Sequence, residues 1–190
     1  MKKIFTLIAL MMVTVMGAKA QDMTDNYSRI YAGFNAFAID SYAENHYGFG
    51  VGYAYGANIT GHNLPMFIEL GGEYAYVSSD KLNEKFHSLA VPVNFTYKFG
   101  NEKFAVAPFI GETFRVGLSY DAPVLAVVTE KTSSIYDDPV NAHRFTVHFS
   151  FGCNFTIAQH YNIGWRTMIA ESYIGKVTDY SSLFSVGYVF

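Results

Sequence analysis

The sequence predicts an all-β fold: an eight-stranded antiparallel up-and-down transmembrane β-barrel. Three observations predict it. Bulky apolar residues alternate with small or polar residues along eight segments, and short and long connections alternate between these segments. The segments are also longer than the usual soluble strand of about five or six residues and match the ~9–11 residues that cross a membrane. Aromatic residues make up 17% of the chain and charged residues only 15%, against roughly 25% charged in a soluble domain.

The first 20 residues are organised like a secretory signal peptide. Lys2 and Lys3 precede an apolar run at residues 4–16, and Ala18 and Ala20 give the small-x-small pattern of a cleavage site. The alternative is an uncleaved anchor, but the run is shorter than the ~20 residues of a spanning helix. Cleavage after Ala20 removes three lysines and no acidic residue, which changes the net charge from −3 to −6. Residues 21–190 are then expected to form the barrel domain.

Eight segments carry the alternation, and we expect each to form one strand. The pattern is strictest in YGFGVGYAYGA, residues 47–57, where five bulky residues alternate with four glycines and an alanine. It is weaker in residues 29–39 and less regular in residues 104–118. The remaining strands are expected at residues 66–76, 88–99, 144–157, 161–173 and 182–190.

The connections predict how the barrel is oriented. Those at residues 60–65, 100–103 and 158–160 are short, whereas those at 40–46, 77–87, 119–143 and 174–181 are longer. Outer-membrane barrels have short periplasmic turns and longer extracellular loops. We therefore expect both termini in the periplasm of a Gram-negative cell, and outer-membrane lipid around the barrel. The last residues, FSVGYVF, resemble the terminal strand by which the barrel-assembly machinery recognises its clients, which makes that machinery an expected partner.

Each strand of such a barrel shows one face to lipid and one to the lumen. Eight strands enclose a lumen only just wide enough for side chains, so the glycines of residues 47–57 are expected to make room for large inward groups. On the lipid face a Lys or Arg at mid-membrane would cost ~2–4 kcal/mol, whereas opposite charges can pair inside. We therefore expect the lumen to be plugged by a polar network of Glu69, Glu73, Lys98, Arg115, Arg144, His148 and Arg166.

Glu112 does not fit this division. Simple alternation places it beside Ile110 and Phe114 on the lipid face. A bulge in this strand, or a position at the edge of the headgroups, would accommodate it, and the sequence does not decide between them.

The connection at residues 119–143 is the best candidate for function. It carries four acidic residues against Lys131, and its middle, PVLAVV, is too apolar to be exposed without a reason. The segment either extends a hairpin beyond the membrane or forms a contact site. The residues of such a contact site are Asp121, Pro123, Val124, Leu125, Val127, Val128, Asp137 and Asp138.

Residues 89–118, LAVPVNFTYKFGNEKFAVAPFIGETFRVGL, resemble the PorT-like outer-membrane β-barrel family. The shared features are the proline in Val91-Pro92-Val93, a short charged turn, and a strand with proline, aromatic and glycine at Pro108-Phe109-Ile110-Gly111. The overall plan of signal, eight strands and terminal aromatic covers the whole chain. The resemblance implies an integral outer-membrane barrel and implies no reaction.

We expect no enzymatic activity, cofactor or metal. Asp40, Ser41 and His46 share one predicted loop, but three common residues in a short loop are weak evidence for a catalytic site. Cys153 is the only cysteine, and His143 and His148 would point to opposite faces of a strand. No basic stripe indicates nucleic-acid binding. The expected role is structural, or binding through the outer loops; the alternatives are a narrow pore for small solutes and, with less support, an enzyme acting at the barrel rim.

Overall fold

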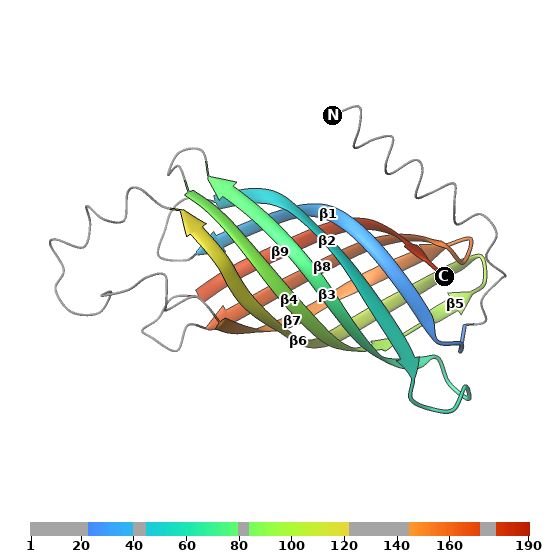
Figure 1. The fold of residues 1–190 in the computed structure, drawn as a ribbon. Helices are drawn as coiled ribbons and strands as arrows, with labels where there is room; N and C mark the ends of the chain where they lie inside the picture. The colour runs from blue at the N-terminus through green and yellow to red at the C-terminus, as the bar shows by residue number, and fades with distance from the viewer. Residues whose placement is uncertain (1–22, 40–44, 80–83, 122–144, 172–177) are drawn as a thin grey trace, which may run out of the picture.

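In the computed structural model, the described residues form eight long antiparallel strands and one short strand, joined by turns (Figure 1). The structure describes residues 23–39, 45–79, 84–121, 145–171 and 178–190. Within these ranges no helix is long and apolar enough to cross a membrane. The strands are β1 (Tyr27–Ile39), β2 (Asn45–Asn58), β3 (Met66–Ser79), β4 (Glu84–Tyr97), β5 (Phe99–Asn101), β6 (Phe104–Asp121), β7 (Phe145–Ile157), β8 (Tyr161–Glu171) and β9 (Thr178–Val189).

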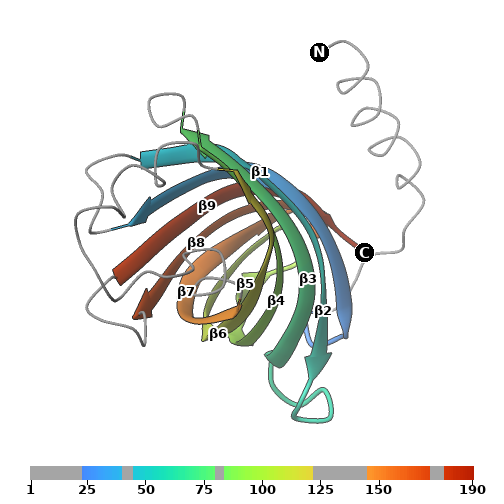
Figure 2. The same cartoon turned by 60° about the vertical axis from the view of Figure 1, so that its left-hand side comes forward.

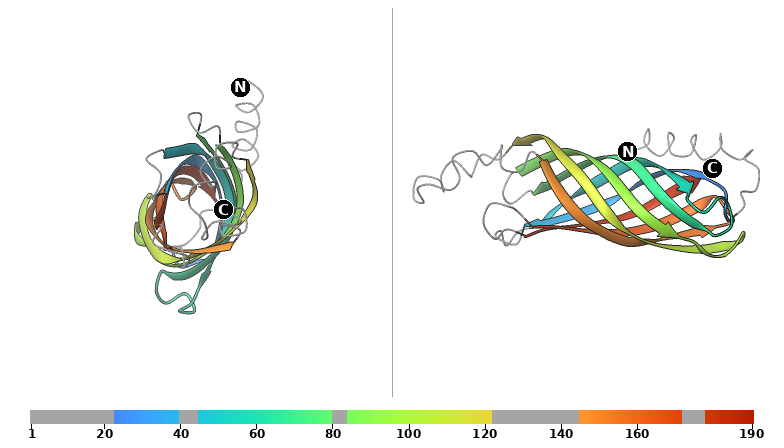
Figure 3. Two further views of the ribbon diagram at one scale, coloured as in Figure 1. Left: turned by 90° about the vertical axis from the view of Figure 1, so that its left-hand side faces the viewer. Right: turned by 90° about the horizontal axis from the view of Figure 1, so that it is seen from below.

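The sheet closes on itself. Each long strand pairs with its neighbours in the sequence, β1 pairs with β9, and β4 pairs with β6, while the short β5 only extends the turn before β6. The view along the axis shows the resulting ring (Figure 3, left). The predicted eight-stranded antiparallel barrel is therefore confirmed. Closure leaves no unpaired sheet edge, which is what a β-sheet in lipid requires.

The strands are strongly staggered around the barrel. The row of paired residues that starts at Tyr27 returns to β1 at Phe37, ten residues further along the strand. A stagger of this kind tilts the strands relative to the barrel axis and fixes the width of the lumen. The row runs through inward-facing residues, namely Tyr27, Gly56, Glu69, Asn94, Gly111, Ser150, Met168, Ser181 and Phe37.

Several strands extend further than the alternation predicts. The pairs Ser78–Lys85 and Ser79–Glu84 continue the ladder between β3 and β4, so most of the expected loop at residues 77–87 is strand. β2 likewise begins at Asn45, which places His46 in a strand and not in a loop. The sequence pattern stops early because residues 78, 79, 84 and 85 are polar on both faces, whereas backbone pairing continues.

The two ends of the barrel differ. One end carries the β2–β3 turn, β5, the β7–β8 turn and Phe190, and we call it the turn end. The β2–β3 turn projects beyond the neighbouring strands there (Figure 2). The backbone of Phe190 exchanges two hydrogen bonds with Ser28, of 2.8 and 2.9 Å, so the last residue is held in the sheet. The opposite end, the loop end, is where β1 ends and β2 begins.

The barrel has an apolar exterior and a polar interior. The bulky residues of YGFGVGYAYGA all face outward, and each is 42–50% exposed: Tyr47, Phe49, Val51, Tyr53 and Tyr55. Inside, Arg29, Glu69, Glu73, Arg115 and Arg166 are each less than 9% exposed. A soluble protein has the opposite arrangement of charged and apolar residues.

Candidate functional site

The glycines of β2 make room for tyrosines from β1. Two rows of paired residues run Tyr27–Gly56–Glu69 and Tyr31–Gly52–Glu73 across β1, β2 and β3. A Cβ atom on Gly52 would lie 2.5 Å from the Tyr31 ring, and one on Gly56 would lie 2.3 Å from the Tyr27 ring. Each tyrosine therefore crosses β2 over a glycine and reaches a glutamate on β3.

Glu69 is the centre of the first cluster in the lumen. The Tyr27 hydroxyl donates to Oε2 over 2.9 Å, and the Arg29 guanidinium donates to Oε1 over 2.9 Å. The same guanidinium also donates to the side chains of Asn154 and Asn162, the second over 3.1 Å. Arg29 thus links β1 to β3 on one side and to β7 and β8 on the other.

Glu73 is the centre of the second cluster. Nη2 of Arg166 lies 2.6 Å from Oε1 and 2.5 Å from Oε2, and the Tyr31 hydroxyl donates to Oε2 over 2.9 Å. Arg166 is on β8 and Glu73 is on β3, which lie four strands apart in either direction around the barrel. This ion pair therefore spans the full width of the lumen.

Both glutamates are buried, and each carboxylate accepts hydrogen bonds from one arginine and one tyrosine. Glu69 is 2% exposed and Glu73 is 3% exposed. A buried charge is tolerable only when it is paired and hydrogen bonded, and removing one partner of such a pair typically costs about 3–5 kcal/mol. The two clusters therefore fix the strands that they connect.

Arg115 and His148 lie nearer the loop end. The Arg115 guanidinium lies 5.8 Å from the centre of the Phe37 ring, and Nη2 lies 3.8 Å from Sδ of Met168. His148 is 1% exposed and its Nδ1 lies 3.4 Å from the Thr146 hydroxyl. This part of the lumen is filled by mixed polar and apolar side chains.

Lys98 lies at the turn end of the lumen, just after β4. Its Nζ lies 3.6 Å from the centre of the Tyr27 ring and 4.5 Å from that of Phe67. Burial lowers the pKa of Lys98 to about 8, against the attraction of the nearby Glu69 carboxylate. Lys98 thus covers the Glu69 cluster on the side of the turn end, and we call it the cap of this cluster.

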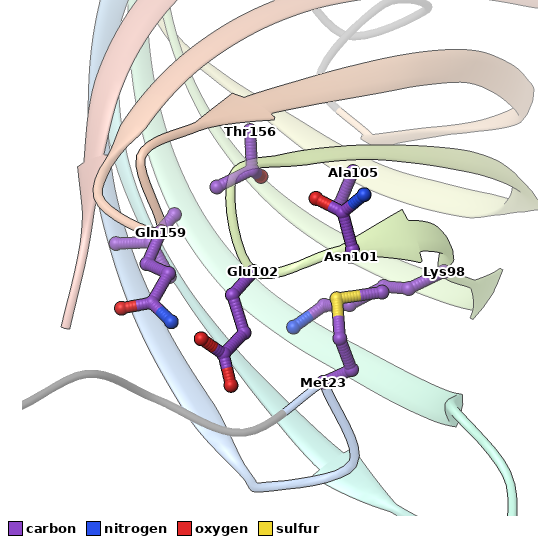
Figure 4. A pocket seen from close by; sticks show the side chains of 8 residues that line it. Met23, Lys98, Asn101, Glu102, Ala105, Thr156 and Gln159 are labelled. Atoms are coloured by element: carbon purple, nitrogen blue, oxygen red, sulfur yellow. The ribbon is translucent and has the colours of Figure 1, made fainter.

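A small pocket lies outside this cap, at the mouth of the turn end. Figure 4 shows Met23, Lys98, Glu102 and Gln159 grouped around it. Among the described residues no group of three metal-binding side chains occurs here or elsewhere. The pocket is lined by Met23, Lys98, Asn101, Glu102, Ala105, Thr156, Gln159 and Val189.

The structure places six of the seven expected lumen residues inside the barrel; Arg144 lies outside the described residues. Glu73 and Arg166 meet, whereas Arg115 and His148 lie apart from the two glutamate clusters. Sequence reasoning missed Arg29, which joins four strands. The sequence signal for Arg29 is weak, because Tyr27 and Tyr31 share its face and their rings blur the alternation of β1. The missed contributors to the clusters are Arg29, Tyr27, Tyr31, Asn94, Asn154 and Asn162.

A bulge does not explain Glu112, because the irregular pairing of β4 with β6 falls at His87 and Ser88, away from Glu112. Glu112 is the ninth of the 18 residues of β6, and its position at the edge of the headgroups stays a prediction. Its side chain is exposed on the outer face.

The other candidates fall mainly outside the described residues. Asp40 and Ser41 do, and so does the proposed contact site at residues 123–138, while Asp121 is the last residue of β6. His46 is 3% exposed and lies 6.0 Å from Phe37, ring centre to ring centre. It therefore packs inside the barrel.

Comparison with solved structures agrees with this architecture. No family model matches the chain, and no curated protein matches it in sequence. Ail, the attachment invasion locus protein of Yersinia pestis, is 15% identical, with a TM-score of 0.52 over 87% of this chain and 99% of Ail. The outer membrane enzyme PagL is 13% identical, with a TM-score of 0.56 over 85% of this chain and 98% of PagL. Neisserial surface protein A is 15% identical, with a TM-score of 0.51 over 86% and 95%.

At these identities the likeness concerns the fold alone. The three proteins differ in what their names describe, so they indicate no shared activity. The closed antiparallel sheet, the apolar exterior and the charged interior are together what a strand-built protein needs in lipid. The chain is an eight-stranded barrel of the outer-membrane type, and the outer membrane is its location.

Proposed function

We propose that this chain is an integral outer-membrane barrel with a lumen plugged by its own side chains, which acts through the segments at its loop end. The role is structural or binding, and not enzymatic. The observation that carries the proposal is the Arg166–Glu73 pair, which joins opposite walls of the barrel.

The plug is supported at three levels of the lumen. Lys98 lies over aromatic rings at the turn end. Towards the loop end, the Arg29–Glu69 cluster follows, and then the Arg166–Glu73 pair. A pore would instead need charged groups that stay hydrated along an open path. Here the charged groups bond to one another.

Conductance of the mature chain in a planar bilayer tests the plug. The wild type is compared with the double variant Glu73→Ala/Arg166→Ala, which removes the pair without leaving one charge alone. Ile163→Ala is the control, because Ile163 lies on the same strand as Arg166 but faces lipid. We expect silence from the wild type and the control, and current from the double variant.

Steady current through the wild type would overturn the plug and favour the narrow pore. Silence from all three proteins, with the double variant shown to be folded by its slower or faster migration on unheated gels, would mean that other side chains close the lumen.

The loop end is proposed to face the cell exterior and to carry the contact surface. Support comes from the length of residues 122–144 and from the apolar PVLAVV within them. Deleting residues 123–138 removes this segment and leaves β6 and β7 intact. We expect an unchanged barrel on unheated gels and loss of a cell-surface property such as adhesion. An unchanged cell surface would argue for a mere hairpin extension.

Two finer proposals rest on the sequence. Membership of the PorT-like family is supported by the two proline motifs, which fall in β4 and β6 and so occupy neighbouring strands. Assembly by the barrel-assembly machinery is supported by the aromatic residue Phe190, which directly follows β9. Replacing Phe190 with Ala is expected to lower the amount of folded protein in the outer membrane, and an unchanged amount would contradict this.

A further inference from the structure

The turn between β2 and β3 leaves the wall of the barrel sideways. It spans residues 59–65, and it lies outside the ring of strands when the barrel is viewed along its axis (Figure 3, left). It reaches no further along the axis than the other turns of the turn end (Figure 1). The tilt of the strands explains this placement, because a hairpin that outgrows its neighbours continues along the tilt and away from the wall. The turn therefore lies beside the barrel and not beyond its end.

The polar groups of this turn are bonded within it. Oδ1 of Asn58 accepts from the backbone N–H of Thr60 over 2.8 Å and from that of His62 over 3.2 Å. Nδ2 of Asn58 and Oγ1 of Thr60 both donate to the Leu64 carbonyl oxygen, over 2.7 and 2.8 Å. Contact with lipid requires such internal bonding, whereas a turn in water can leave these groups to the solvent. The backbone N–H groups that donate inside the turn are those of Ile59, Thr60, His62, Asn63, Leu64 and Met66.

The two sides of the turn differ in polarity. One side contacts the chain that precedes β1. Nδ2 of Asn58 donates to the Thr24 carbonyl oxygen over 2.9 Å, and the backbone N–H of Asn58 donates to the Asn26 side chain over 2.7 Å. The side chains of Ile59 and Leu64 take no part in these contacts and are 51% and 48% exposed. The turn is thus polar where it meets its own chain and apolar where it is exposed.

Ile59 continues the lipid-facing surface of β2 and β3. The outward residues of β2 occupy every second position up to Tyr55, and Ile59 has the same parity. The backbone N–H of Ile59 donates to the Met66 carbonyl oxygen over 3.0 Å, so the ladder extends by one pair and keeps this alternation. Ala57, between Tyr55 and Ile59 in this row, pairs with the outward Ile68 of β3. The apolar surface therefore continues from the wall onto the turn.

We propose that the β2–β3 turn is a lipid anchor at the turn end of the barrel. Ile59 and Leu64 lie among the lipids at the boundary of the leaflet there, and Asn58 holds the turn in the shape that presents them. The partner is the lipid of the surrounding bilayer, because the apolar side of the turn is continuous with the surface that faces lipid. The polar tip, residues 61–63, remains among the headgroups.

A soluble protein that docks on the turn is the competing partner. A specific protein interface usually buries about 800 Å² on each partner, whereas the turn offers two apolar side chains. Lipid needs no such area, since the attraction of a segment to the headgroup boundary grows with whatever apolar area it buries there. The position beside the wall also favours lipid, because lipid surrounds the wall of a membrane barrel.

Nitroxide spin labels test where Ile59 lies. The background variant is Cys153→Ser, which removes the only native cysteine, and each mature chain is folded into phosphatidylcholine vesicles. Ile59→Cys carries the label at the proposed anchor. Lys103→Cys carries it on the exposed turn between β5 and β6, at the same end, and Val51→Cys carries it on the outward face of β2. Collision of the label with oxygen, which concentrates in lipid, is compared with collision with a nickel chelate, which stays in water.

We expect the label at residue 59 to collide more with oxygen than with the nickel chelate, as at residue 51, and the label at residue 103 to show the reverse. Adding Asn58→Ala to Ile59→Cys should shift the ratio towards that of residue 103, because the turn loses the side chain that organises it. Adding Asn58→Asp should retain most of the preference for oxygen, since its carboxylate still accepts from the N–H groups of Thr60 and His62.

Three results would contradict the proposal. A label at residue 59 that meets the nickel chelate as readily as the label at residue 103 would place the turn in water. A label at residue 59 that neither reagent reaches would mean that protein, and not lipid, covers Ile59. A preference for oxygen that Asn58→Ala leaves unchanged, in protein that migrates as folded on unheated gels, would remove the role assigned to Asn58.

Discussion

Glu73 and Arg166 show how single residues link opposite walls of the barrel. Each is buried, and each depends on the other for its charge to be compensated. The Tyr31 hydroxyl adds a third contact from β1. The stability of the barrel should therefore respond to the loss of one partner far more than to the loss of both.

A double-mutant comparison measures this dependence. Arg166→Met leaves the Glu73 carboxylate buried without its cation, and we expect it to lower the free energy of unfolding by about 3–5 kcal/mol. Arg166→Met/Glu73→Leu removes both charges and should recover most of that loss. Urea unfolding in lipid or detergent can be followed by the fluorescence of Trp165, the only tryptophan of the chain. Equal losses in the single and double variants would show that the pair is not coupled.

Lys98 should titrate close to neutrality. Burial against the Tyr27 and Phe67 rings disfavours its charged form and lowers its pKa to about 8 from 10.5. The signal of ¹³C-dimethylated Lys98, assigned through Lys98→Arg, would report the pKa by NMR. A Lys98 signal that titrates at the ordinary lysine pKa of about 10.4 would contradict the burial of the amine.

Strand β2 explains both what the sequence can predict and what it cannot. Its alternation of bulk and glycine predicts a strand with one outward apolar face, and this face is exposed as expected. The sequence does not show which residues fill the space over the glycines, because Tyr27 and Tyr31 belong to β1 and arrive through strand register. The same tyrosines weaken the alternation of β1, since they put aromatic rings on the lumen face. Arg29 is therefore not recognised as a lumen residue from the sequence.

Strand β6 has a blurred pattern because one residue of each kind lies on the unexpected face. Phe109 is apolar and faces inward, whereas Glu112 is charged and faces outward.

Substitutions of two glycines test whether β2 makes room for the tyrosine side chains that β1 places in the lumen. Gly52→Val would push a branched side chain into the Tyr31 ring, which lies 2.5 Å from the added Cβ. We expect a marked fall in folded protein on unheated gels, because overpacking a filled interior typically costs about 1–3 kcal/mol. Gly72→Val is the control: Gly72 is exposed, and a Cβ there meets nothing within 4 Å. Similar yields from the two variants would mean that the lumen adjusts freely around Tyr31.

The whole barrel is stable only in surroundings that match its surface. Its exterior is a belt of mainly aliphatic and aromatic side chains, and two buried ion pairs, Arg29–Glu69 and Arg166–Glu73, lie within. In water this arrangement would expose the apolar belt, whereas in lipid it exposes no unpaired backbone group. The length of the strands, 11–18 residues in the eight that form the wall, fits a membrane crossing by tilted strands.

Trp165 can report whether lipid covers this belt. It is the fifth of the 11 residues of β8, is 38% exposed, and faces outward beside the buried Arg166. In vesicles of lipid brominated along the acyl chains, we expect its fluorescence to be strongly quenched, and aqueous iodide to have little effect. The variant Trp165→Phe/Tyr161→Trp is the matched comparison, because residue 161 lies at the turn end of the same strand and should be quenched less by bromine deep in the bilayer. Quenching of Trp165 by iodide instead of bromolipid, in protein that migrates as folded on unheated gels, would mean that the apolar belt faces water and that the barrel does not span the bilayer.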